Sequence, residues 1–301
     1  MAKATFSILQ VIIIMAIAPL ISGVITKIKN NLRFRRGPGV FQPYYNLVKL
    51  FAKEEVISET ASWIFRVAPF IVIASVVTAA FLVPAFISGY NAGDLLLLVF
   101  LFSLGRFFLA LSALDTASAF GGMGSSREMF ISSFAEATAI LSIFAVCLNL
   151  GTTNLNAVNL YTVKLSTIIA AISLFVVILA ETSRIPIDNQ ETHLELTMIH
   201  EAMVLEYSGR SLAAIEFASY IKQAVFFSLI GTILLPQFFS AGLLNNFMVF
   251  VYYIAKIFGL CVLVSFIEVH LAKMRLFRAV DFFSFSFVFS LVAIILAALG
   301  V

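Results

Sequence analysis

Charged residues are scarce in this chain. Only 12% of its 301 residues are Asp, Glu, Lys or Arg, whereas 61% are hydrophobic. A typical soluble domain is about 25% charged and about 45–50% apolar. The mean hydropathy of +1.06 agrees with this shortage of charge. The composition therefore excludes an ordinary soluble protein with a large core and predicts an integral membrane protein.

Cysteine and histidine are scarce as well. The two cysteines, Cys147 and Cys261, each lie inside an apolar segment, where a thiol usually serves as a small buried hydrophobe. An iron–sulfur cluster needs about four thiolates, so this chain is not expected to hold a conventional cluster. Two of the three histidines, His193 and His200, lack the HExxH spacing of a helical zinc site. We therefore expect no metal in this chain, and the small net charge of +3 gives no reason to expect a nucleic-acid partner.

Long apolar runs fill most of the remaining sequence. A helix that crosses a membrane needs about 20 predominantly apolar residues. We therefore predict an all-α integral membrane protein with about eight transmembrane helices and further short cytoplasmic helices, forming one domain over residues 1–301. The expected spans are 6–26, 65–88, 94–114, 130–150, 164–182, 217–240, 244–268 and 280–300.

The basic residues predict the orientation. Most Lys and Arg residues fall in loops on one side of the membrane, whereas the other side receives only Lys3 and Lys164. The positive-inside rule then makes the basic side cytoplasmic, with both termini outside. The first apolar run is too long for the apolar region of a signal peptide, and the basic cluster follows it, so we expect a retained anchor. The expected cytoplasmic loops cover about 27–64, 115–129, 183–216 and 269–279.

The first of these loops contains "RRGPGVFQPYYNLVKLFAKEE", from Arg35 to Glu55. The Gly-Pro-Gly sequence permits tight turns and fixes one backbone dihedral. The following residues have apolar side chains at helical spacing with Lys49 and Lys53 between them, which indicates a short amphipathic helix along the membrane surface. Two interpretations remain open: a helix that only fixes the topology, or one that docks a partner protein.

The third loop is rich in acidic residues. "ETSRIPIDNQETHLELTMIHEAMVLEYSG" holds six carboxylates between Glu181 and Gly209, with Arg184 as the only fixed positive charge before Gly209. Pro186 prevents the fifth span from simply continuing. Asp188 has the position of a helix cap, and a helix over about 189–207 would end at the glycine.

On such a helix, Glu191, Glu195 and Glu206 would share one face, with His193 and His200 nearly opposite. A solvated amphipathic face is the simple interpretation. Clustered carboxylates also repel one another and hold protons more tightly, which suits proton uptake. We therefore keep both interpretations.

Ionisable residues inside spans are costly and indicate function. Arg106 and Glu136 lie about eight residues from the same side in neighbouring spans, so we expect them to pair at equal depth. Lys256 lies near the middle of a span with no escape to the surface, whereas Lys222 is close enough to one end to snorkel. The candidate residues of a proton path are Glu136, Glu181, Asp188, Glu191, Glu195, Glu206, Lys256, Arg106, His193 and His200.

The loop motifs also carry a family resemblance. The two stretches quoted above, together with "ALDTASAFGGMGSSRE" (Ala113–Glu128), resemble the membrane subunit of group 4 energy-converting NiFe hydrogenases, called formate hydrogenlyase subunit 4 or hydrogenase-4 component C. That family is related to subunit 1 of respiratory complex I. The resemblance covers nearly the whole chain and implies the complex I subunit 1-like arrangement of spans.

Residue by residue, the resemblance rests on specific positions. Glu136 matches the glutamate within the family's fourth span. The pattern ETxRxPxD is matched by Glu181, Arg184, Pro186 and Asp188, the acids of ExxxEL by Glu191 and Glu195, and EYSG by Glu206–Gly209.

The resemblance implies a non-catalytic protein that anchors peripheral hydrogenase-like large and small subunits to antiporter-like membrane subunits in the lipid bilayer. Such a protein helps to couple electron transfer to proton or sodium movement in the cytoplasmic (inner) membrane of a prokaryote. No cofactor is expected in this chain, because the iron–sulfur clusters, and any NiFe centre, would lie in the partners. The candidate docking residues are Arg35, Arg36, Gly37, Pro38, Gly39, Arg127 and Arg184.

Two departures from the complex I pattern bear on the alternatives. Three extra residues separate Glu195 from the EYSG motif, and Asn46 stands where relatives often carry aspartate. The insertion alters the loop that would border a quinone cavity, which favours the hydrogenase-type assignment. The alternatives are a quinone-site subunit, an autonomous ion transporter and a purely structural anchor.

Overall fold

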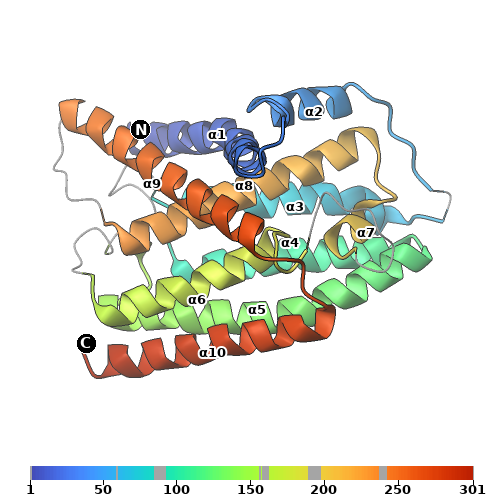
Figure 1. Cartoon of the computed structure of the whole chain (residues 1–301). Helices are drawn as coiled ribbons and strands as arrows, with labels where there is room; N and C mark the ends of the chain where they lie inside the picture. Colours follow the sequence, from blue (N-terminus) through green and yellow to red (C-terminus); the bar gives the residue numbers. More distant parts are fainter. Residues whose placement is uncertain are drawn as a thin grey trace.

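The computed structural model describes residues 2–58, 60–84, 93–155, 157, 163–188, 198–236 and 243–300. Figure 1 shows long helices lying side by side in a bundle, with short helices at one end. The described helices are α1 (Ala2–Leu32), α2 (Gln42–Phe51), α3 (Trp63–Leu82), α4 (Leu95–Asp115), α5 (Ala119–Leu150), α6 (Leu165–Glu181), α7 (His200–Val204), α8 (Gly209–Leu234), α9 (Leu243–His270) and α10 (Leu276–Ala298).

The predicted all-α membrane fold is confirmed. Seven of the described helices are long and apolar enough to cross a membrane, and α6 is an eighth apolar helix of 17 residues. The described residues form no strand beyond one isolated bridge between Asp94 and Asn154. The short α2 lies on the outside of the bundle next to α1, as the amphipathic pattern predicts (Figure 1).

Two helices begin two turns or more before the spans that the sequence indicates. α5 starts at Ala119 rather than near 130, and α8 starts at Gly209 rather than near 217. The small residues after Ser118 resemble a loop in composition, yet the Ser118 hydroxyl caps the first turn by accepting from the Gly121 N–H at 3.0 Å. At Gly124, a Cβ would lie only 2.8 Å from the Cβ of Ala202. Because Gly124 has no side chain, α7 can pack directly against α5.

The expected helix over 189–207 is found only in part. The described portion contains α7 alone, and its preceding residue Ile199 is not helical. Residues 189–197 lie outside the described residues, and Glu191, His193 and Glu195 are among them.

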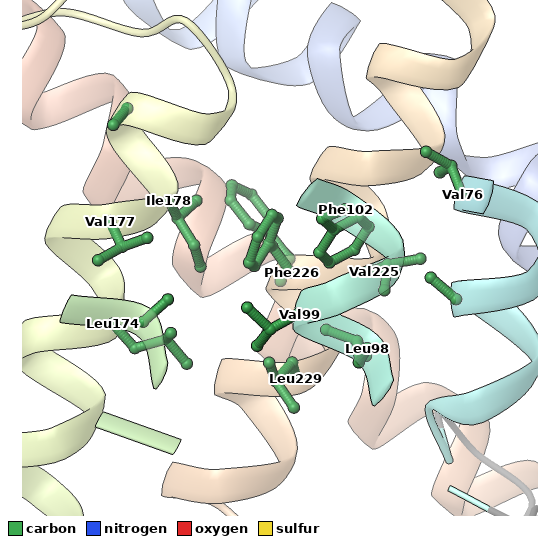
Figure 2. Close-up of a cluster of buried hydrophobic side chains, with 14 of the residues drawn as sticks. Val76, Leu98, Val99, Phe102, Leu174, Val177, Ile178, Val225, Phe226 and Leu229 are labelled. Carbon is green, nitrogen blue, oxygen red and sulfur yellow. The ribbon is translucent and has the colours of Figure 1, made fainter. Parts of the chain in front are cut away.

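An apolar layer crosses the middle of the bundle. Figure 2 shows side chains of α3, α4, α6 and α8 meeting there. Phe102 of α4 stacks on Phe226 of α8 with ring centroids 4.5 Å apart. These two rings and Ile178 of α6 are all buried. The ionisable residues Arg106, Glu181 and Lys222 follow about one helical turn away, so the layer closes the space beneath them.

The EYSG segment fastens a loop to the start of α8. The Tyr207 hydroxyl donates to the Phe65 carbonyl at 3.0 Å, and the two rings stack at 3.9 Å. Burial raises the pKa of Tyr207 to about 12, so the hydroxyl keeps its proton. Ser208 Oγ accepts from the Val56 N–H at 2.8 Å and donates to the Val56 carbonyl at 2.9 Å. These bonds hold the connection between α2 and α3 against the α8 terminus.

Gly209 completes this joint, which leads to a prediction. Its φ is +52°, and a Cβ would lie 2.5 Å from the Glu54 carbonyl oxygen. We expect Gly209→Ala to destabilise the protein by about 1–3 kcal/mol through backbone strain and steric conflict, seen as a lower melting temperature in detergent. The matched control is Gly122→Ala, where a Cβ would have open space. Equal melting temperatures for both variants would contradict this account of the joint.

Candidate functional site

Five charged side chains from four helices meet next to the apolar layer, and we call them the central charge cluster. Its members are Arg106, Glu128, Glu136, Glu181 and Lys222. Arg106 Nη1 lies 2.8 Å from Glu136 Oε1, and its Nε lies 3.8 Å from Glu128 Oε1. Arg106 Nη2 also contacts Glu181, whose other oxygen lies 2.6 Å from Lys222 Nζ.

The geometry of this cluster tests two sequence expectations. The predicted pairing of Arg106 with Glu136 is confirmed. The expectation that Lys222 snorkels to the surface is wrong, because its ammonium turns inward to Glu181. The side chains of Arg106 and Glu181 are only 5% and 4% exposed. Charges so far from water persist only where opposite charges and hydrogen bonds compensate them.

A second buried cluster surrounds Arg184, and we call it the Arg184 cluster. The guanidinium donates to Glu268 Oε1 at 3.1 Å, and to Ser22 Oγ and Gln223 Oε1 at 3.2 Å each. Lys29 Nζ lies 3.1 Å from the other Glu268 oxygen. This cluster joins α1, α8 and α9 to the segment that follows α6.

Asp188 forms the third attachment of the same segment. Its carboxylate accepts from Lys273 Nζ at 2.6 Å and from the His200 backbone N–H at 3.1 Å. The nearby Pro186 carbonyl accepts from the Met274 N–H at 2.8 Å. Glu181, Arg184 and Asp188 therefore connect one eight-residue motif to helices from both halves of the chain.

Two cavities lie on either side of this motif. The first measures about 230 Å³ and lies between α1, α2 and the Arg184 segment, with Lys29, Asp188 and Glu268 among its polar lining. The second measures about 50 Å³ and touches Arg106, Glu181 and Lys222. Both exceed the volume of about 10–15 Å³ that a water molecule needs. Ser183 lines both cavities, so it is the residue at which they approach each other.

His200 faces the second cavity from α7. Burial lowers the pKa of its imidazole below the ordinary value of 6.5, chiefly because the charged form loses hydration. The side chain is therefore neutral at pH 7 beside the central charge cluster.

A sequence profile of the NADH dehydrogenase family matches residues 4–298. This chain belongs to the NADH dehydrogenase family. Hydrogenase-4 component C of Escherichia coli K12 is 34% identical over 239 residues, covering 77% of this chain and 75% of that protein. Formate hydrogenlyase subunit 4 of the same organism is 29% identical over 284 residues, covering 90% and 91%. The family resemblance drawn from the loop motifs is thereby confirmed.

The family extends to complex I proteins, and a chain of an archaeal complex shares the fold. NADH-ubiquinone oxidoreductase chain 1 of Cyanidium caldarium is 29% identical over 241 residues, covering 75% of this chain and 67% of that protein. In the solved structure of the membrane-bound sulfane sulfur reductase, an archaeal respiratory membrane complex, one chain superposes with a TM-score of 0.86. The match is 18% identical and covers 99% of this chain and 100% of that chain, which shows a shared fold. These family members are subunits of multi-subunit membrane complexes, and the present chain is a multi-pass membrane protein.

Lys256 lies apart from the charged groups that the motif brings together. Its ammonium donates to the carbonyls of Leu235 at 2.8 Å and Gly231 at 3.3 Å, at the end of α8, and lies 4.5 Å from the Tyr252 ring centre. A cation at a helix C-terminus satisfies free carbonyls and the helix dipole. These contacts account for the burial of Lys256 without any role in a proton path. The sequence alone could not predict them.

The predicted docking residues divide into two groups. Arg35, Arg36, Pro38 and Gly39 are exposed and Gly37 is half-buried, so this loop is available to a partner. Arg127 instead donates to the Met198 carbonyl at 3.0 Å.

Arg184 is only 8% exposed and serves the interior. Its assignment to docking is therefore replaced by a role inside the chain. Among the path candidates, Glu206 is exposed on the turn before α8.

Several partners of these clusters escaped the sequence analysis. Glu268 occupies the last turn of an expected span. The sequence placed Lys29 in a loop, as one of the basic residues that set the orientation. Gln223 and Glu128 carry no distinctive pattern. The one available signal is Glu268 itself, a carboxylate close to the end of an apolar run, which requires a cation from elsewhere in the fold.

Removing Arg184 tests the compensation in its cluster. We expect Arg184→Met to cost about 3–5 kcal/mol, because Glu268 loses a cation inside the protein. Loss of helical circular dichroism during SDS titration measures the change. Arg210→Met is the matched control, since Arg210 is exposed. A cost below about 1 kcal/mol for Arg184→Met would show that the cluster is not stabilising.

His200 predicts a pH dependence of stability. Its folded pKa lies below that of the unfolded chain, so the unfolded state binds more protons and stability rises with pH. We expect the melting temperature to fall as pH decreases below about 6.5, and the fall to be smaller in His200→Gln. Melting curves from pH 7.5 to 5.5 for both proteins measure the difference. Identical slopes would contradict the burial of a neutral imidazole.

Proposed function

We propose that this chain is the membrane anchor and coupling subunit of a hydrogenase-type redox complex related to complex I. It links electron transfer in peripheral subunits to proton or sodium translocation in the membrane. The observation that carries the proposal is the central charge cluster, buried at mid-span and bordered by a cavity. The similarity to hydrogenase-4 component C and formate hydrogenlyase subunit 4 supports the choice of complex.

The electron chemistry belongs to partner subunits. Cys147 and Cys261 are buried in α5 and α9. In the described part of the chain, no group of three or more His, Cys, Asp or Glu side chains could hold a metal ion. The similarity to hydrogenase-4 component C and formate hydrogenlyase subunit 4 supports assigning iron–sulfur clusters, and any NiFe centre, to peripheral hydrogenase-like large and small subunits. These subunits dock on the cytoplasmic side, where the exposed Arg35–Gly39 loop lies, and antiporter-like subunits lie beside the chain in the inner membrane.

The residues of this chain hold and pass protons. A proton enters the larger cavity, which has Asp188 and Glu268 in its wall, and passes Ser183 into the smaller one. There the neutral His200 and Glu128 lie next to Arg106. Arg106 and Lys222 compensate the charge of Glu181, and a proton delivered to the cluster passes along its side chains. The apolar layer around Phe102 and Phe226 blocks a direct leak across the bundle.

A quinone-site subunit is the second candidate. The larger cavity is bounded by the amphipathic α2, where an extended lipid-soluble molecule could enter. Its volume of about 230 Å³ is below the range of about 300–1,000 Å³ typical of small-molecule sites. The size therefore favours water over a quinone. An autonomous ion transporter ranks lower, since its only buried lysine outside the clusters among the described residues, Lys256, caps a helix.

Purification in mild detergent, followed by mass spectrometry of the attached proteins, tests the assignment. A large subunit with both nickel-binding cysteine pairs, together with antiporter-like chains, would support the hydrogenase-type complex. A large subunit without those cysteines would favour the quinone or another acceptor. Recovery of this chain alone would contradict the proposal and favour a transporter.

Two glutamine substitutions test the proton path. We expect Glu136→Gln and Glu195→Gln to leave the complex assembled but to lower ion-coupled activity by roughly tenfold or more, because an amide cannot exchange a proton. Redox-driven ion uptake into vesicles, normalised to electron transfer, measures the coupling. Glu54→Gln is the control, since Glu54 is exposed on the loop before α3. Unchanged coupling in both test variants would contradict the path.

A further inference from the structure

Helices α6 and α10 lie next to each other as an antiparallel pair, with α10 along the lower edge of the bundle in Figure 1. Contacts join the two helices at three depths. At one end, Lys164 Nζ donates to the Gly300 carbonyl at 3.0 Å. At the other end, the Met274 N–H donates to the Pro186 carbonyl at 2.8 Å, just before α10 begins. The third set of contacts lies at mid-span, among side chains to which the proposed function gives no role.

Three buried serines make the mid-span contact, and we call them the hydroxyl triad. They are Ser142 of α5, Ser173 of α6 and Ser286 of α10, and each is at most 1% exposed. Ser173 Oγ donates to the Ser286 carbonyl at 2.8 Å, and Ser286 Oγ donates to the Ser173 carbonyl at 2.9 Å. Ser142 Oγ donates to Ser173 Oγ at 2.9 Å. The triad therefore ties α6 to both of its neighbours at one depth.

The exchange of hydrogen bonds between Ser173 and Ser286 fixes how α6 and α10 line up along their axes. Lipid tails are as apolar as the faces of these helices, so apolar burial alone does not favour one axial register over another. A shift of α6 by one turn, about 5.4 Å, would break both bonds. The hydroxyl triad thus holds α6 at a defined depth in the bundle.

The depth of α6 decides where Glu181 lies, because Glu181 is the last residue of this helix. Ser173 precedes it by eight residues, or about 12 Å of helix. The carboxylate contacts Arg106 of α4 with one oxygen, and its other oxygen lies 2.6 Å from Lys222 Nζ of α8. Charged or titratable side chains from four elements surround it: Arg106, Glu128, Glu136, His200 and Lys222. A displaced α6 would lengthen both ion pairs of Glu181 at once.

We propose that the hydroxyl triad is a positioning device, which holds α6 at the depth where Glu181 meets both Arg106 and Lys222. The inference rests on the proposed function, because it gives the triad a part in ion coupling. Its serines are positioning residues, since they act through α6. A buried serine can also bond only its own helix, as Ser290 Oγ does by donating to the Phe287 carbonyl at 2.7 Å.

The pH profile of coupling tests the positioning role. The double substitution Ser173→Ala and Ser286→Ala removes the hydroxyls that join α6 to α10. Redox-driven ion uptake per electron transferred is measured across a pH series, on vesicles that hold the complete complex. A less compensated Glu181 binds protons more tightly. We therefore expect the half-maximal point on the acidic side to move up by about half a pH unit, the equivalent of one interhelical hydrogen bond in a membrane.

The matched control is Ser290→Ala, because Ser290 is equally buried in α10 but bonds its own helix. We expect this variant to keep the unmodified profile. A merely structural role of the triad would lower the amount of assembled complex, and the normalisation to electron transfer removes that effect. An unchanged profile in the double variant, or the same shift in Ser290→Ala, would overturn the proposal.

A distance measurement separates this inference from the proposed function. Spin labels at positions 104 of α4 and 172 of α6, where Leu104 and Ile172 are exposed, report the position of α6 by electron paramagnetic resonance of the full chain in lipid nanodiscs. We expect the double variant to widen or displace the distance distribution by about 1 Å or more, enough to impair a positioned group. Ser290→Ala should leave the distribution unchanged.

The two measurements fail independently. An unchanged distance distribution in the double variant overturns the inference, whatever the coupling shows. A changed distribution, in a complex whose unmodified form moves no ion, contradicts the proposed function and supports the hold of the triad on α6.

Discussion

The compensation of buried charge is the constraint on which the rest of the structure depends. A guanidinium or carboxylate removed from water requires partners at hydrogen-bond distance, and a missing partner costs several kcal/mol. The motif ETSRIPID places Glu181, Arg184 and Asp188 within eight residues, and each finds its partners on other elements. This short segment therefore fixes how the helices of the first and second halves of the chain sit against one another.

The same constraint separates two environments within the bundle. The central charge cluster and the two cavities beside the ETSRIPID motif lie on one side of the apolar layer, which is formed by residues such as Phe102, Ile178 and Phe226. Figure 2 shows this layer. Each of these apolar residues is about one turn from a charged one on its own helix. Water and protons therefore have polar surroundings next to the central charge cluster, and the buried apolar side chains of the layer separate this region from the far end of α8. A coupling subunit needs this asymmetry, because an open path would dissipate the gradient.

The sequence predicted correctly those features that depend only on the length of apolar runs or on the free-energy cost of a buried charge. The length of the apolar runs predicted the spans. The high free energy of an unpaired charge in the middle of a membrane predicted the Arg106–Glu136 pair. The prediction failed at the start of α5, where the small residues of a helix resemble a loop in composition. It also failed where a long side chain can reach either the surface or the interior. Lys222 is near enough to one end of α8 to reach the surface, yet Glu181 of α6 draws it inward. Only the position of another helix decides between those outcomes.

The sequence by itself determined the membrane class, the family and the motif loops, because hydropathy and local spacing are properties of the chain. The tertiary structure decided which charges meet. Glu268 compensates Arg184 across 84 residues, and Lys256 caps α8 instead of joining the acids. Electrostatic partners inside a membrane are chosen by distance in space, and separation along the chain does not encode that distance.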